Sequence, residues 1–231
     1  MRKLLLLLFI PIVCFGQTSE YYYNLGNSKM NTKDYYGAIT AFTKAIEINP
    51  NIYQFYYNRA ISKDNIKDYY GAISDYTKAI ELNQNYAAAF NNRGLSKSKL
   101  KDKNGAMLDF SKAIKLQPNL SEPYYNRGLI RYDLKDFYGA IADFTKMIEI
   151  NPNDSFAFVN RGVSKDELKD FYGAISDFTR AIEINPNYGE AFSYRGVSKA
   201  KLGDYNGACK DAYKSQKLGL DAYTLINLVC N

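Results

Sequence analysis

Apolar and small side chains recur along this chain at the spacing of an amphipathic helix. Phe158 and Gly162 fall on one face of a first predicted helix, and Phe178 and Ala181 fall on one face of a second. The Asn-Pro-Asn segment that begins at Asn185 ends the second helix, because proline cannot continue a helix. The pattern predicts two helices joined by a short turn.

This helix–turn–helix pattern returns every 34 residues without an insertion. A fixed period of this length indicates a repeat architecture. The dipeptide Gly-Ala marks the period, and Asn-Pro and Arg-Gly recur in the same register. The Gly-Ala pairs begin at Gly37, Gly71, Gly105, Gly139, Gly173 and Gly207. The predicted units are 19–52, 53–86, 87–120, 121–154, 155–188 and 189–222.

The fourth unit shows the order of residues by which a known family is recognised: a large aromatic, then small and apolar residues, and finally a proline. These residues are Tyr124, Gly128, Ala140, Phe144, Met147 and Pro152. The pattern resembles the tetratricopeptide repeat family, with Tyr or Phe where that family usually has Trp. The resemblance implies an all-α fold, a right-handed α-solenoid of six helix–turn–helix repeats around a continuous core. Residues 221–231 follow the repeats, and we expect them to form a C-terminal capping helix.

Glycine recurs in the middle of the first helix of most units, where it costs about 1 kcal/mol relative to alanine. We expect a close approach there, with each glycine facing an alanine of the second helix. The glycines are Gly26, Gly94, Gly128, Gly162 and Gly196, and Ala60 replaces glycine in the second unit.

Two charged columns are lost together in the first unit, which has Leu25 and Ala41 at these positions. The joint loss predicts an Arg–Asp pair within each of the other units; a basic stripe for an acidic ligand is the alternative. The arginines are Arg59, Arg93, Arg127, Arg161 and Arg195, and the aspartates are Asp75, Asp109, Asp143, Asp177 and Asp211. A further basic column is expected to be a solvated face whose stems cover apolar surface. It comprises Lys29, Lys63, Lys97, Arg131, Lys165 and Lys199.

The N-terminal residues 1–16 have the features of a secretory signal peptide: a basic head, a short apolar stretch and small residues before a polar start. We expect cleavage after Gly16 and export to the periplasm, the cell envelope or the medium, as in exported bacterial members of the family. A lipoprotein signal that acylates Cys14 is the alternative. No second apolar run of spanning length follows, so no transmembrane segment is expected after cleavage. In an exported chain, Cys209 and Cys230 form a disulfide or remain two separate thiols.

Composition argues against several functions. The chain has no histidine, and its formal charge of +6 includes Arg2 and Lys3 and forms no run of like charges, which does not favour a nucleic-acid partner. No phosphate-binding loop, metal-ligand cluster or activated nucleophile is evident, so we expect no enzyme activity, no cofactor and no metal.

The family resemblance implies that the first helices of successive repeats line a concave groove. Asparagine, which both donates and accepts hydrogen bonds, recurs there in one column, and tyrosine recurs one position earlier. The candidate partner-binding residues are Tyr23, Asn24, Asn27, Tyr57, Asn58, Asn92, Tyr125, Asn126, Tyr132, Asn160 and Tyr194. Apolar patches are expected beside them, at Leu95, Leu129, Val163 and Val197. Alternatively, the asparagines merely tolerate an exposed helix face, and some of the tyrosines complete the packing between repeats.

The sequence therefore predicts a non-catalytic protein–protein interaction scaffold or adaptor. It would bind a partner protein or peptide in the groove, outside the cytoplasm. The alternative is a cell-envelope glycan-binding protein that uses the tyrosine-rich surface. The partner and the oligomeric state stay open, because one repeat scaffold serves many functions.

Overall fold

The computed structural model describes residues 18–230, which form thirteen helices and no β-strand. The predicted signal peptide, with Cys14, lies outside these residues. The helices are α1 Ser19–Asn31, α2 Tyr35–Ile48, α3 Tyr53–Asn65, α4 Tyr69–Leu82, α5 Ala87–Lys99, α6 Lys103–Leu116, α7 Ser121–Asp133, α8 Phe137–Ile150, α9 Ser155–Glu167, α10 Phe171–Ile184, α11 Gly189–Lys201, α12 Tyr205–Lys217 and α13 Tyr223–Val229.

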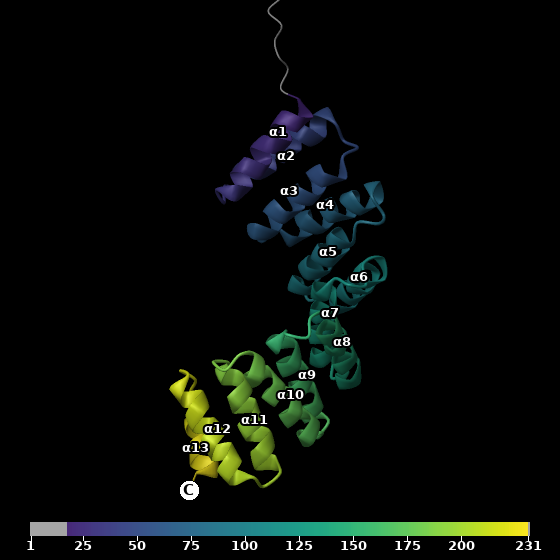
Figure 1. Cartoon of the computed structure of the whole chain (residues 1–231). Coiled ribbons are helices and arrows are strands. Elements are labelled where there is room, and N and C mark those ends of the chain that lie inside the picture. Colours follow the sequence, from purple (N-terminus) through teal and green to yellow (C-terminus); the bar gives the residue numbers. More distant parts are fainter. Residues whose placement is uncertain (1–17, 231) are drawn as a thin grey trace, which may run out of the picture. The chain divides into compact units, whose positions relative to one another are not determined.

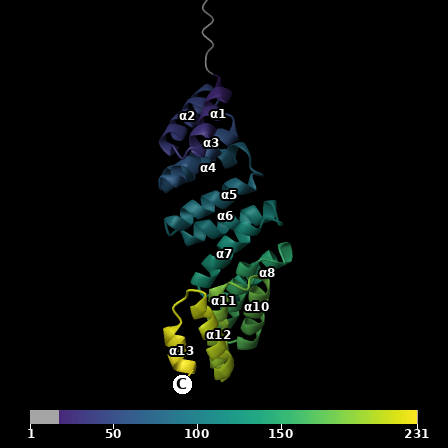
Figure 2. The ribbon, with the colours of Figure 1, turned by 60° about the vertical axis from the view of Figure 1, so that its left-hand side comes forward.

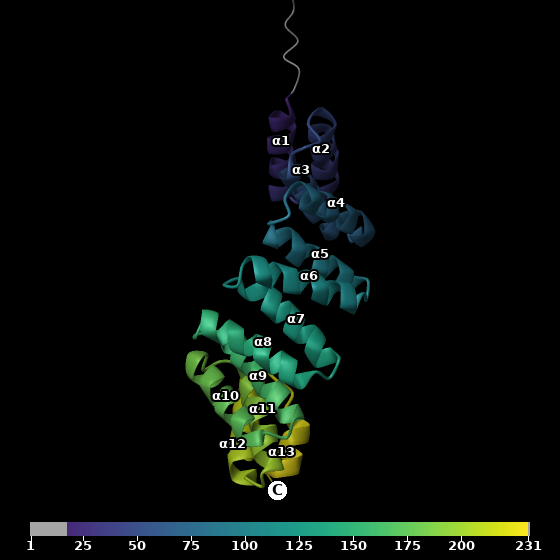
Figure 3. The same cartoon turned by 90° about the vertical axis from the view of Figure 1, so that its right-hand side faces the viewer.

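The described part of the chain divides into two compact units, which meet between Leu82 and Asn83 and contain α1–α4 and α5–α13 respectively. Within each unit, consecutive helices pack as hairpin pairs, and each pair packs against the next (Figure 1). Figures 2 and 3 show this succession of pairs from two further directions. The predicted all-α architecture of helix–turn–helix repeats is confirmed.

The second helix of each repeat begins at an aspartate that caps it. In α8, a side-chain oxygen of Asp136 accepts a hydrogen bond from the backbone N–H of Gly139 at 3.0 Å. A Cβ atom on Gly139 would lie 2.1 Å from the other carboxylate oxygen of Asp136. The Gly-Ala dipeptide that marks the period therefore places its glycine where the capping carboxylate needs space.

Four of the five mid-helix glycines of the first helices, all but Gly196, face a buried aromatic ring, so our expectation that they face alanine was wrong at these positions. A Cβ atom on Gly128 would lie 2.8 Å from the ring of Phe144, which has no exposed surface. The glycine is needed because a large ring, and not a small residue, fills the space between the two helices. In the sixth repeat Ala212 replaces the ring. A Cβ atom on Gly196 would lie 3.2 Å from the carbonyl oxygen of Ala208 and 3.2 Å from Leu225 of α13, so the expected approach to alanine is found in this repeat.

The predicted Arg–Asp pairs are confirmed in all five repeats that carry both residues. In the fourth repeat, Arg127 donates from Nε and Nη2 to the two carboxylate oxygens of Asp143, at 3.0 and 2.6 Å. Its Nη1 donates to Ser111 Oγ on α6, at 2.8 Å, and so links the pair to the preceding repeat. The bidentate pairs join Arg59 to Asp75, Arg93 to Asp109, Arg127 to Asp143, Arg161 to Asp177 and Arg195 to Asp211.

The further basic column was wrongly expected to be a solvated face. Arg131 lies 2.9 Å from the carboxylate of Asp143, which therefore holds two cations while its side chain is only 3% exposed. Lys29 is the exception, because the first repeat has Ala41 where the other repeats have the buried aspartate. Lys29 pairs instead with Asp34, whose side chain is 43% exposed. The other pairs of this kind join Lys63, Lys97, Lys165 and Lys199 to the aspartates of their own repeats.

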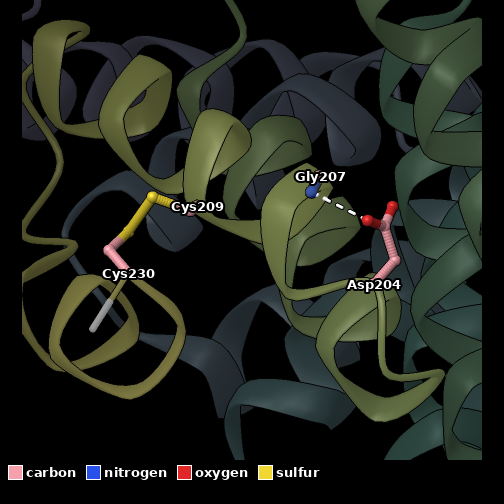
Figure 4. The surroundings of a disulfide bond; sticks show 4 residues. All are labelled: Asp204, Gly207, Cys209 and Cys230. Atoms are coloured by element: carbon pink, nitrogen blue, oxygen red, sulfur yellow. Dashed lines mark hydrogen bonds between the residues drawn. A yellow bond between two sulfur atoms is a disulfide. The ribbon is translucent and has the colours of Figure 1, made fainter.

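The C-terminal helix α13 packs against α12 and α11. Its residues Ala222, at the N-cap, and Val229 are buried. In the structure, a disulfide joins Cys209 of α12 to Cys230, the residue after α13 (Figure 4). The bond connects the last repeat to the helix that covers it.

Candidate binding site

A pocket of about 360 Å³ opens on the first helices of the second unit. Its walls come from α7, α9 and α11, which follow one another in Figure 1, with one ring contributed by α8. The lining side chains are Tyr125, Leu129, Tyr132, Phe144, Phe156, Val159, Asn160, Val163, Tyr188, Glu190 and Tyr194.

Helical periodicity explains why these side chains meet. In α7, Tyr125 and Tyr132 are seven residues apart, and in α11, Glu190 and Tyr194 are four residues apart, so each pair shares one face. In α9 the lining residues fall at successive spacings of three, one and three, from Phe156 to Val163. Three parallel faces of first helices therefore converge on one hollow.

The aromatic rings of the pocket are held by neighbouring rings. Tyr188, in the loop before α11, packs against Phe156 with ring centroids 5.1 Å apart. Tyr194 stacks on the buried ring of Phe178, at 5.7 Å and an interplanar angle of 23°. Such contacts fix the ring faces that a ligand would meet.

Two tyrosine hydroxyls at the pocket keep their protons well above neutral pH. Two causes together raise the pKa of Tyr132 to about 12. The larger is burial, and the second is the hydrogen bond of 3.1 Å that its hydroxyl donates to Glu167. Burial also raises the pKa of Tyr188 to about 12, with a further contribution from the charge of Glu190. Both phenols are therefore neutral over the whole physiological range.

The repeats match known family models along most of the chain. Residues 19–52 and 121–154 match one model of the tetratricopeptide repeat, and residues 53–86, 87–120 and 157–188 match a second model with the same description. The chain belongs to the tetratricopeptide repeat family. The fold and the family both support a protein–protein interaction scaffold.

Solved tetratricopeptide repeat structures resemble this protein over most of its length. YrrB, described as having an unusual peptide-binding site, is 25% identical, with a TM-score of 0.71 over 81% of this chain and 96% of its own. PilF of Pseudomonas aeruginosa is 18% identical, with a TM-score of 0.73 over 90% and 96% of the two chains. MamA of Desulfovibrio magneticus RS-1 is 19% identical, with a TM-score of 0.67 over 72% and 94%. No curated protein sequence matches the chain.

Four of the predicted partner-binding residues of this tetratricopeptide repeat protein line the pocket. They are Tyr125, Tyr132, Asn160 and Tyr194. Leu129 and Val163, expected as apolar patches, line it as well. The second unit thus brings together tyrosine, asparagine and apolar side chains from three repeats.

The remaining asparagines do not form a row of available amides. Asn58 donates to Tyr23 Oη at 3.1 Å and to Asn27 Oδ1 at 3.0 Å, which joins α3 to α1 within the first unit. Asn126 donates to Asn91 Oδ1 at 3.2 Å and so joins α7 to α5. These contacts favour a structural role between repeats for both side chains.

The other three candidates have different surroundings. Tyr57 packs against Tyr76 of α4, with ring centroids 5.8 Å apart. Asn92 accepts a hydrogen bond from its neighbour Asn91, at 3.2 Å. Asn24 is exposed on α1. None of these three lines the pocket of the second unit.

The candidate residues came from columns that the repeats share, so several lining residues were not predicted, among them Phe156, Val159, Tyr188 and Glu190. At the position of Phe156, the first and fourth repeats have Glu20 and Glu122, and the third has Ala88. The departure of Phe156 from this pattern was the signal that could have located the site.

A second set of aromatic residues lies on the second helices, apart from the pocket. Four tyrosines at the second position of these helices are exposed by 73–77%. They are Tyr36, Tyr70, Tyr138 and Tyr172. They form the most exposed part of the tyrosine-rich surface on which glycan binding would rest.

Proposed function

We propose that this protein is a non-catalytic scaffold that binds an extended segment of a partner protein in the pocket formed by α7, α9 and α11. The observation that supports this site most directly is the gathering of aromatic side chains around one hollow. A concave site lined by aromatic and aliphatic side chains with a few polar groups is typical of ligand binding. The resemblance to YrrB, whose structure is described as containing a peptide-binding site, supports a peptide as the ligand.

The repeat pattern separates side chains that hold the fold from those available for binding. The residues that hold helix pairs together recur in most repeats, as Phe110, Phe144 and Phe178 do. By contrast, Tyr132 and Phe156 occupy positions where most other repeats have small or polar residues, such as Ser98 or Ala88. Since the fold does not require these aromatics elsewhere, a binding role accounts for them in this pocket.

A random-peptide library displayed on phage, selected on the mature chain, tests this function. We expect enriched peptides to lose affinity for the Phe156→Ala variant, since Phe156 is 60% exposed in the pocket. Alanine is tolerated at this repeat position, which Ala88 occupies in the third repeat. Tyr138→Ala, which removes a 76% exposed ring on α8 outside the pocket, is the matched control.

A polysaccharide array probed with the same three proteins tests the alternative. Glycan binding that is lost in Tyr138→Ala, together with a failure to enrich any peptide, would show that the exposed tyrosines of the second helices are functional and the pocket is not. Peptides that bind Phe156→Ala as tightly as the unaltered chain would move the site away from the pocket.

The proposed location is outside the cytoplasm. The signal-like residues 1–16 support it, and so does the Cys209–Cys230 bond, because disulfides persist mainly in oxidising compartments. Within residues 18–230, no helix combines the length and apolar character needed to cross a membrane. Expression of the full chain in a bacterium that exports it, followed by mass spectrometry, is the test: the exported product should begin at Gln17 and contain no free thiol. A cytoplasmic product that retains Met1 would contradict export.

A further inference from the structure

The side chains that line the pocket carry a single charge, and it is negative. Glu190 is the only acidic or basic side chain among the described residues that line it. Glu190 lies in the first turn of α11. The pocket therefore presents a carboxylate among aromatic rings.

Carboxylates just outside the lining reinforce this sign. Glu167 accepts the hydrogen bond of the Tyr132 hydroxyl, and Asp154 caps the N-terminus of α9. The basic side chains described on α7, α9 and α11 are paired with aspartates. Arg127 and Arg131 pair with Asp143, Arg161 and Lys165 with Asp177, Arg195 and Lys199 with Asp211, and Lys201 with Asp166. A cation that enters the pocket would meet acidic groups from α9 and α11.

The polar atoms at the pocket include acceptors that suit a cation. The side-chain nitrogen of Asn160 donates to the backbone carbonyl of Phe156, at 2.8 Å. Its Oδ1 atom, an acceptor, and its second N–H remain for a ligand. Glu190 adds two carboxylate oxygens. The tyrosine and phenylalanine rings add negative π faces, which attract cations within about 6 Å of the ring centroid.

We propose that this pocket selects a basic side chain, arginine or lysine, in the segment that the scaffold binds. This inference rests on the proposed function, since it names the chemistry recognised at the same site. The volume of about 360 Å³ is near the lower end of the range for ligand pockets, roughly 300–1,000 Å³, and suits one long side chain with its flanking backbone.

Other occupants match these groups less well. An acidic side chain would be repelled by Glu190. An apolar side chain would fill the aromatic walls but would gain no attraction to the carboxylate of Glu190 or to the ring faces, which favours a basic residue over it. The net charge of +6 on the whole chain acts weakly here, because salt screens charges over about 8 Å at physiological ionic strength.

The test uses a peptide enriched by the display selection, synthesised with its basic residue intact and with citrulline, the neutral isostere of arginine, in its place. A lysine in the enriched peptide is first exchanged for arginine. Titration calorimetry on the mature chain should show about tenfold weaker binding of the citrulline peptide, because it loses both the cation–π contacts and the ion pair with Glu190. The Glu190→Gln variant should bind the arginine peptide about fivefold more weakly and the citrulline peptide unchanged.

The chain offers a matched control for this variant. Glu122 occupies the same repeat position in the first turn of α7 and lies outside the pocket lining, so Glu122→Gln should leave both affinities unchanged. Enriched peptides without a basic residue, or equal affinities for the arginine and citrulline peptides, would overturn the preference for a cation while the proposed scaffold function stands. Failure to enrich any peptide would instead contradict the proposed function itself.

Discussion

At the scale of single residues, the buried aspartates of the second helices are the positions where we expect substitution to cost the most stability. Asp143 is 2% exposed and contacts both Arg127 and Arg131. Its removal leaves two partly buried cations without their counter-charge, which costs far more than the loss of a surface pair. We expect Asp143→Ala to lower the free energy of unfolding by about 3 kcal/mol, as measured by urea denaturation.

A double-mutant cycle separates this coupling from general loss of packing. Arg127→Ala combined with Asp143→Ala should destabilise the protein by clearly less than the sum of the single changes, because the two residues share one interaction. Lys146→Ala, which breaks an exposed pair with Glu149, is the control and should barely change stability. Additive losses from Arg127→Ala and Asp143→Ala would contradict the pairing as an energetic unit.

The raised pKa of Tyr132, to about 12, predicts a loss of stability at alkaline pH. In the unfolded chain this phenol loses its proton near pH 10, whereas in the folded chain it keeps it until about pH 12. The folded state therefore binds more protons in this window, and stability falls as the pH rises through it. Urea midpoints should fall less steeply between pH 10 and pH 12 for Tyr132→Phe than for the unaltered chain. Tyr138→Phe, which removes an exposed phenol, should follow the unaltered chain; equal slopes in all three would refute the prediction.

The residue columns show what the sequence revealed about these interactions and what it did not. The Arg–Asp pairing was predictable because the first repeat loses both partners at once, with Leu25 and Ala41. The second cation was not predicted, because Lys29 keeps this column intact in the first repeat and so hides its dependence on the aspartate. A carboxylate has about four acceptor sites, so one buried aspartate serves two donors.

At the scale of elements, the turn between the two helices of a repeat places a lysine in the left-handed conformation. Lys135 has a φ of 63°, and its N–H bonds to the carbonyl of Tyr132 while that of Asp136 bonds to Arg131. This is the Schellman arrangement, in which glycine is the favoured residue. The lysines in this conformation are Lys33, Lys67, Lys101, Lys135 and Lys169, and Gly203 occupies the same place in the sixth repeat.

We expect Lys135→Gly to raise the free energy of unfolding by about 0.5–1 kcal/mol, since glycine adopts positive φ without the strain of a Cβ atom. The converse change, Gly203→Lys, should lower it by a similar amount. Urea denaturation measures both. Because the turns lie in separate repeats, the gain from Lys101→Gly should add to that from Lys135→Gly. Destabilisation by Lys135→Gly would show that the lysine side chain contributes more than its backbone strain costs.

At the scale of the whole molecule, the 34-residue period made the fold predictable but did not indicate the binding site. Every repeat needs the same core, so the recurrence of Phe110, Phe144 and Phe178 indicates the architecture. A binding site needs no recurrence, and the pocket includes residues such as Tyr132 and Phe156 that depart from their columns. The asparagine column recurs because Asn58 and Asn126 connect neighbouring first helices, which is a property of the scaffold.

The first and sixth repeats differ in the contacts that stabilise them, and this difference predicts a gradient of local stability along the repeats. The first repeat lacks the Arg–Asp pair, with Leu25 and Ala41 at these positions. The sixth has Arg195 bound to Asp211 and is covered by α13, which the disulfide ties to α12. In a repeat protein, each unit depends mainly on its neighbours, so the less supported end opens first.

Native-state hydrogen exchange should therefore show α1 and α2 exchanging faster than α11 and α12. The disulfide closes a loop with a sequence separation of 21, for which the chain-entropy estimate is about 3 kcal/mol. Reduction should consequently speed exchange in α13 and α12 and leave α1 and α2 unchanged, because they belong to the other unit. A double Cys209→Ser, Cys230→Ser variant should reproduce the reduced pattern without added thiol. Equal protection at both ends of the oxidised chain, or faster exchange in α1 on reduction, would contradict the view that the cap and its disulfide stabilise the C-terminal repeat locally.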